Sequence, residues 1–141
     1  MSAFWRGWLT SWCVLVIVFG LVLAGGGLEA TDGVAEMLFG ILGGPGDLTW
    51  TPILRFSVAL MGAVTMGWGL TFFAVFTAAH QLGNQATTVW RLVTASVLAW
   101  FIIDSALSIA TGFALNAVSN AGLLVGYFIP VLATGVLKRT Q

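Results

Sequence analysis

Residues 8–28 read WLTSWCVLVIVFGLVLAGGGL and contain no charged side chain. The hydrocarbon core of a bilayer is about 30 Å thick, and an α-helix needs about 20 apolar residues to cross it. The stretch is long enough to do so, whereas the apolar part of a secretory signal has only about 7–15 residues. We therefore predict a membrane-spanning helix here and not a cleaved leader.

Three further apolar stretches follow, at residues 53–79, 89–112 and 120–137. Lipid offers the backbone no hydrogen-bond partner, so each stretch is expected to be helical. The chain has 141 residues and is 59% hydrophobic and 7% charged, against about 25% charged residues in a soluble domain. The sequence predicts a single all-α domain over residues 1–141, a four-helix transmembrane bundle that runs up-down-up-down.

The first loop is the longest and carries apolar residues at helical spacing. These residues are Val34, Met37, Leu38, Ile41 and Leu42. The spacing predicts a short amphipathic helix at about residues 33–42, lying on the membrane surface. An ordinary loop with apolar anchors is the alternative interpretation.

Charged residues orient the chain in the membrane. Four basic residues fall on one side of a four-span arrangement: Arg6, Arg91, Lys138 and Arg139. Four acidic residues fall in the first loop, on the other side: Glu29, Asp32, Glu36 and Asp47. Because positive charge stays in the cytoplasm, the N- and C-termini are predicted to be cytoplasmic. The formal net charge is zero, so nucleic acid is not a predicted partner, whereas the lipid bilayer is.

Tryptophans gather where the predicted helices meet the membrane surface. Trp5, Trp8 and Trp12 lie at the inner end of the first stretch, and Trp90 lies at the inner end of the third. Such positions are typical of the aromatic belt of membrane proteins. No cofactor is needed to explain these side chains.

Arg55 and Asp104 depart from this charge pattern. An ionisable side chain within a span costs about 2.5–3.5 kcal/mol on insertion scales and marks a functional-site hypothesis. Asp104 shares a helix face with Ser108 and Thr111, and Arg55 enters residues 53–79 from the same outer side. We predict an Arg55–Asp104 ion pair that only locks two helices. In the alternative interpretation, Asp104 with Ser105, Ser108 and Thr111 forms a proton or ion site of a small transporter or channel.

His80 is the only histidine and lies near the inner end of residues 53–79. The simpler interpretation is a polar residue that ends a helix at the membrane surface. The alternative is a single axial ligand to a haem or a chlorophyll-type pigment, in a pigment- or haem-associated subunit. One cysteine, Cys13, provides neither a disulfide within the chain nor a cysteine metal cluster, and no metal site is predicted.

Small residues recur at four-residue steps within the apolar stretches. The candidate packing positions are Ala59, Gly62, Ala63, Gly67, Gly122 and Gly126. Small residues let helix backbones approach closely within a membrane. The stripes predict either a tight bundle or a surface that docks another membrane protein, and the pattern does not separate the two.

Sequence motifs of enzymes are missing from the chain. There is no HExxH zinc motif, no GxSxG nucleophile motif and no pair of catalytic carboxylates. We therefore predict a protein that is not an enzyme. The leading hypothesis is a non-catalytic accessory or assembly subunit of a larger membrane complex, for instance an energy-transducing one.

A family resemblance adds to this interpretation. An arginine leads into a glycine-rich second stretch, and two asparagines look like a turn before the fourth; the residues are Arg55-Phe56-Ser57, Gly62, Gly67-Trp68-Gly69, Asn116 and Asn120. In this the chain resembles small four-span bacterial membrane proteins of the DoxX-like kind. The resemblance implies a place in the bacterial inner membrane, and it implies no single activity and no functional residues.

Overall fold

The computed structural model describes residues 1–44 and 46–138, which are mostly helical and contain no β-strand. The elements are α1 (Ala3–Gly25), α2 (Gly33–Leu42), α3 (Pro52–Leu82), the 3₁₀-helix η1 (Gly83–Ala86), α4 (Thr87–Ala110) and α5 (Ala114–Thr134). The predicted all-α class is confirmed.

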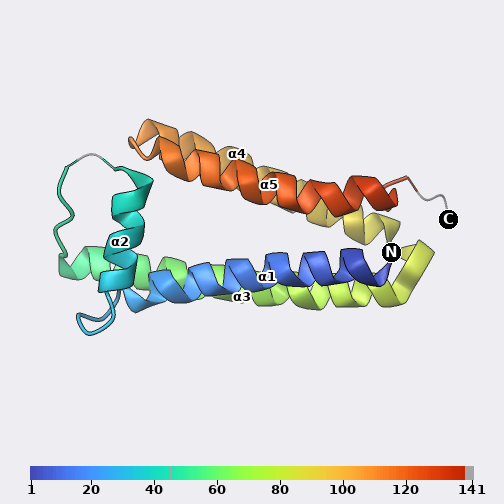
Figure 1. Ribbon diagram of the computed structural model, residues 1–141, viewed down its shortest axis with the longest axis horizontal. Helices are drawn as coiled ribbons and strands as arrows, with labels where there is room; N and C mark the ends of the chain where they lie inside the picture. Colours follow the sequence, from blue (N-terminus) through green and yellow to red (C-terminus); the bar gives the residue numbers. More distant parts are fainter. Residues whose placement is uncertain (45, 139–141) are drawn as a thin grey trace.

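The long helices associate in two pairs. Figure 1 shows α1 beside α3 and α4 beside α5, and these two pairs also make the most extensive helix contacts. The start of α1 and the end of α5 lie at the same end of the molecule, and α2 crosses between the two pairs at the other end. Arg139, one of the charges used to orient the chain, lies outside the described residues.

Three helical stretches are long and apolar enough to cross a membrane: Ala3–Gly25, Pro52–Ala110 and Ala114–Thr134. The second has 59 residues, which would extend about 90 Å as one straight helix at 1.5 Å per residue. It does not run straight, because η1 divides it into α3 and α4 and Gly83 adopts a φ of +59° at the turn. These helices are those of a membrane protein.

The backbones of α1 and α3 touch directly at glycines. A Cβ atom on Gly62 would lie 2.6 Å from the carbonyl oxygen of Gly20 and closer still to the amide nitrogen of Ala24. A Cβ atom on Gly69 would lie 3.1 Å from the amide nitrogen of Ile17. Such close approach maximises van der Waals contact where lipid supplies no hydrophobic driving force between helices.

An aromatic cluster joins the two helix pairs. The Trp12 ring of α1 lies 5.6 Å from the Phe72 ring of α3 and 6.1 Å from the Tyr127 ring of α5, measured between centroids. Trp12 also donates from Nε1 to the Leu123 carbonyl oxygen at 2.9 Å. These buried rings form the core that holds α1, α3 and α5 together.

Helices α3 and α4 lie close to the predicted residues 53–79 and 89–112, whereas α1 runs from Ala3 to Gly25 and not over the predicted residues 8–28. A helix spans Gly33–Leu42 as expected, and Thr51 caps α3 by accepting a hydrogen bond from the Leu54 amide at 3.2 Å. By contrast, α5 begins at Ala114 and not near residue 120. Asn116 and Asn120, which were expected to mark a turn, lie inside α5, because their side-chain amides bond to α4.

Candidate functional sites

Polar side chains line the contact between α4 and α5. We call this set the polar seam; it consists of Asp104, Ser105, Ser108, Asn116 and Asn120. Asn120 donates from Nδ2 to Asp104 Oδ2 at 2.8 Å and to Ser105 Oγ at 3.3 Å. Asn116 donates from Nδ2 to Ser108 Oγ at 2.8 Å. Three of the five, Ser105, Ser108 and Asn120, are buried, so these bonds satisfy groups that would otherwise be costly in lipid.

The partner of Asp104 differs from the one predicted. Arg55 Nη2 lies 2.9 Å from Asp32 Oδ2, and Arg55 Nη1 donates to the Gly26 carbonyl oxygen at 3.4 Å. The Arg55 guanidinium also lies over the Trp50 ring, 5.0 Å from its centroid. The predicted Arg55–Asp104 ion pair is therefore wrong, because Arg55 pairs with Asp32. Arg55 stays with the acidic residue of the adjacent loop, and Asp104 belongs to the other helix pair.

The seam contains some of the predicted polar residues and adds others. Ser108 is part of it, whereas Thr111 is exposed and bonds from Oγ1 to the Leu107 carbonyl oxygen of its own helix at 2.8 Å. The two asparagines were missed as seam residues. Their signal in the sequence is their spacing: Asn116 and Asn120 are four residues apart, as are Asp104 and Ser108. Residues four apart lie on the same face of a helix, so each helix presents two polar side chains on one face.

The chemistry of Asp104 is set by neutral neighbours. Among residues 1–44 and 46–138 its side chain has no cationic partner, and its hydrogen-bond donor is the Asn120 amide. A carboxyl group placed this way can tie two helices together, and it can also hold a proton or a small cation. Hydrogen bonds between membrane helices contribute only about 0.6 kcal/mol on average and about 1.7 at most, so the seam is a modest stabiliser.

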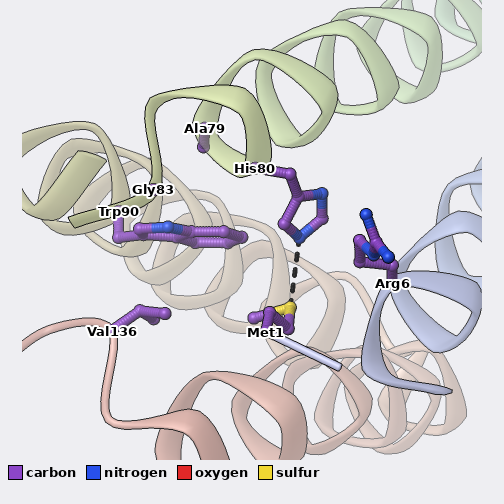
Figure 2. A pocket seen from close by; sticks show the side chains of 7 residues that line it. All are labelled: Met1, Arg6, Ala79, His80, Gly83, Trp90 and Val136. Atoms are coloured by element: carbon purple, nitrogen blue, oxygen red, sulfur yellow. Dashed lines mark hydrogen bonds between the residues drawn. The ribbon is translucent and has the colours of Figure 1, made fainter. Parts of the chain in front are cut away.

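A second site surrounds His80 at the other end of the molecule. A cavity of about 50 Å³ is lined by Met1, Arg6, Ala79, His80, Gly83, Trp90 and Val136 (Figure 2). His80 Nε2 lies 3.1 Å from Met1 Sδ, and the imidazole centroid lies 5.7 Å from that of Trp90. The cavity admits a few water-sized groups.

A haem macrocycle is far larger than this cavity and would have to lie outside it. Axial ligation by His80 stays a prediction, which a Soret or Qy band in the absorption spectrum of the purified chain tests. Among the described residues, no three or more His, Cys, Asp or Glu side chains gather to hold a metal ion.

Three of the predicted packing positions contact other parts of the chain. Gly62 touches the backbone of α1, and Ala59 Cβ lies 2.7 Å from where a Cβ on Gly27 would be. A Cβ on Gly126 would lie 3.4 Å from the Trp12 ring, and the Gly126 carbonyl oxygen accepts a 2.8 Å hydrogen bond from Trp8 Nε1.

The other three packing positions, Ala63, Gly67 and Gly122, face outward and are exposed. A Cβ atom added to Gly67 or Gly122 would meet nothing within 4 Å. Of the six small residues, three therefore pack within the chain and three are exposed on its surface.

Comparison of the chain with models of protein families, with curated proteins and with solved structures finds no match. The resemblance to DoxX-like proteins stays a prediction.

Proposed function

We propose that this chain is a non-catalytic protein of the bacterial inner membrane that packs as an accessory or assembly subunit against a larger membrane complex. An energy-transducing complex is one class of partner that would suit it. In this proposal α1, α3, α4 and α5 each cross the bilayer. Their lengths of 23, 31, 24 and 21 residues all reach the roughly 20 residues that a crossing needs.

Charge separation supports an orientation with both ends in the cytoplasm. Arg6 lies in the first turn of α1 and Lys138 follows α5, whereas Asp32 is the N-cap residue of α2 and Glu36 lies in its first turn. The start of α1 and the end of α5 lie at one end of the molecule, and α2 lies at the other (Figure 1). Basic residues favour the cytoplasmic side. Arg55 is the basic residue on the outer side, and its ion pair with Asp32 offsets its charge there.

The observation that carries the proposed role is a second small-residue face on α3. Gly62 and Gly69 pack against α1, while small exposed residues follow the opposite side of the helix: Ala63, Gly67, Thr71, Ala74 and Ala78. In a membrane, a face of small residues makes the most van der Waals contact when another helix packs closely against its backbone. A transmembrane helix of a larger protein is the partner that fits.

The test compares two glycines that both face open space. The tagged chain is extracted in mild detergent from membranes of cells that make it natively, as wild type, Gly67→Leu and Gly122→Leu. We expect wild type and Gly122→Leu to carry the same partner protein and Gly67→Leu to lose it, because only residue 67 lies on the small-residue face. A chain that is always recovered alone, or that keeps its partner equally in all three forms, contradicts the proposal.

A second candidate function rests on Asp104, whose carboxyl group has an amide donor and no cation partner in the described chain. This supports a small transporter or channel that conducts protons or cations along the polar seam. Proton and Na⁺ flux into liposomes tests it with Asp104→Asn, and Asp32→Asn is the matched control outside the seam. We expect loss of flux only for Asp104→Asn, and equal flux in all forms counts against transport.

A further inference from the structure

The end of the molecule that holds the His80 cavity carries basic side chains without acidic ones among the described residues. Arg6 and Arg91 lie there, on α1 and α4, and Lys138 follows α5. The acidic side chains lie in residues 29–47 and at Asp104, toward the other end. Within residues 1–44 and 46–138, no side-chain carboxylate lies at this end to offset its positive charge.

Arg6 differs from the other described arginines in having a free guanidinium. Arg55 pairs with Asp32, and Arg91 donates from Nη2 to the Leu137 carbonyl oxygen at 3.1 Å. The Arg6 side chain has no ion pair or hydrogen bond within residues 1–44 and 46–138, and it lines the cavity. An arginine fork that is exposed and unpaired is available to an anionic ligand.

The cavity places a second nitrogen donor beside this guanidinium. Figure 2 shows the His80 imidazole with Nε2 toward Met1 and with the other ring nitrogen on the side that faces Arg6. Trp90 and Val136 supply apolar walls. At about 50 Å³, the cavity suits a compact polar group the size of a phosphate.

Aromatic side chains beside Arg6 indicate the depth of the cavity. Phe4 and Trp5 lie 4.8 Å apart and Trp5 and Trp8 lie 6.0 Å apart, measured between ring centroids. Phe4 is 65% exposed and Trp8 is 39% exposed, so this cluster faces the surroundings of the protein. Aromatic clusters of this kind sit at the level of the lipid headgroups. In the proposed membrane placement, the Arg6 guanidinium lies at the level of the lipid phosphates.

We propose that the Arg6–His80 cavity binds the phosphate of an anionic phospholipid from the cytoplasmic leaflet. Arg6 grips the phosphate oxygens with its fork of N–H donors, and the free ring nitrogen of His80 donates to a further oxygen when it carries a proton. Basic pockets between helices on the cytoplasmic side suit such headgroups. The leaflet assignment rests on the proposed orientation, whereas the binding chemistry does not.

The experiment measures lipid binding to the purified full-length chain in a non-ionic detergent by native mass spectrometry. Phosphatidylglycerol and phosphatidylcholine with the same acyl chains are compared, and inorganic phosphate is added in a third arm. We expect wild type to prefer phosphatidylglycerol, and Arg6→Gln to lower that affinity about tenfold or more, which corresponds to the loss of direct hydrogen bonds to a charged phosphate. Inorganic phosphate alone should not displace the lipid.

Lys138→Gln is the matched control, because it removes the same charge from the same end without touching the cavity. It should change the affinity much less than Arg6→Gln does, and Arg6→Lys should fall between wild type and Arg6→Gln because it keeps the charge and loses the fork. Equal losses in Arg6→Gln and Lys138→Gln, or no preference for phosphatidylglycerol, overturn the proposal. Displacement by inorganic phosphate assigns the cavity to free phosphate and also overturns it.

This measurement is independent of the accessory role, since no partner complex is present. A failed search for a partner leaves lipid binding intact, and a failed lipid preference leaves the accessory role intact. Circular dichroism of each variant shows whether its helices are retained.

Discussion

Replacing Gly62 with alanine places a methyl group where the backbones of α1 and α3 touch. The added Cβ would lie 2.6 Å from the Gly20 carbonyl oxygen and 2.7 Å from the Ala24 Cα. Carbon atoms in good contact are about 3.5–4.0 Å apart, so the two helices must separate locally by about 1 Å. The atoms in the way are backbone atoms, which cannot rotate aside as a flexible side chain can.

The magnitude follows from two opposed effects. Overpacking of this kind costs about 1–3 kcal/mol. Alanine in a helix interior is intrinsically favoured over glycine by about 0.5–1 kcal/mol. Gly67→Ala on the same helix gains the helix propensity of alanine without the overpacking cost, because its Cβ would meet nothing within 4 Å. The difference between the two variants therefore isolates the overpacking cost, and Gly62→Ala should be about 1–3 kcal/mol less stable than Gly67→Ala.

Reversible unfolding in mixed micelles, titrated with sodium dodecyl sulfate and followed by tryptophan fluorescence, measures this difference. Trp12 and Trp90 contribute a signal that depends on folding, because both are buried in the core. Gly67→Ala should match or exceed wild type in stability. If Gly62→Ala and Gly67→Ala unfold with the same free energy, α1 and α3 are not in direct backbone contact and the reasoning fails.

Asn120→Leu should lower the free energy of unfolding by about 1–2 kcal/mol, because it removes the hydrogen bonds to Asp104 and Ser105. Asp104→Asn keeps an acceptor for Asn120 and should therefore lower the free energy of unfolding by less. A larger loss of stability in Asp104→Asn than in Asn120→Leu argues against the polar seam. Asp32→Asn should cost more than the at most about 1 kcal/mol that a solvent-exposed pair contributes, since the side chains of its pair with Arg55 are only 18% and 20% exposed. It should also speed amide exchange in α2. Unchanged exchange in α2 would show that the pair does not hold that helix. Tyr127→Phe should cost about 1 kcal/mol through loss of the 2.9 Å bond to Thr94, and an unchanged stability would mean that this bond contributes nothing.

Local chemistry made several elements predictable. Thr51 followed by Pro52 starts α3 because the threonine caps it and proline fits the first turn, and the sequence carries both signals. Apolar spacing in the first loop similarly located α2. These elements depend on neighbours in the sequence, so their signals are local.

Contacts between distant helices were harder to predict. Asn116 and Asn120 are common turn residues, and only their partners Ser108 and Asp104 on α4 explain why they lie inside α5. The choice of Asp32 and not Asp104 as the partner of Arg55 depends on how α2 folds back, which the charge pattern alone does not determine. Gly62 and Gly67 likewise look equivalent in sequence, although only Gly62 meets α1.

Four membrane crossings with both ends in the cytoplasm form the central claim, and thiol labelling in intact cells tests it most directly. Single cysteines are placed at Ser2, Glu36 and Asn84 in a Cys13→Ala background and treated with a membrane-impermeant reagent. Glu36→Cys should react in intact cells, whereas Ser2→Cys and Asn84→Cys should react only after the membrane is permeabilised. Labelling of Asn84→Cys from outside intact cells would contradict the claim, because the turn between α3 and α4 must then lie on the outer side.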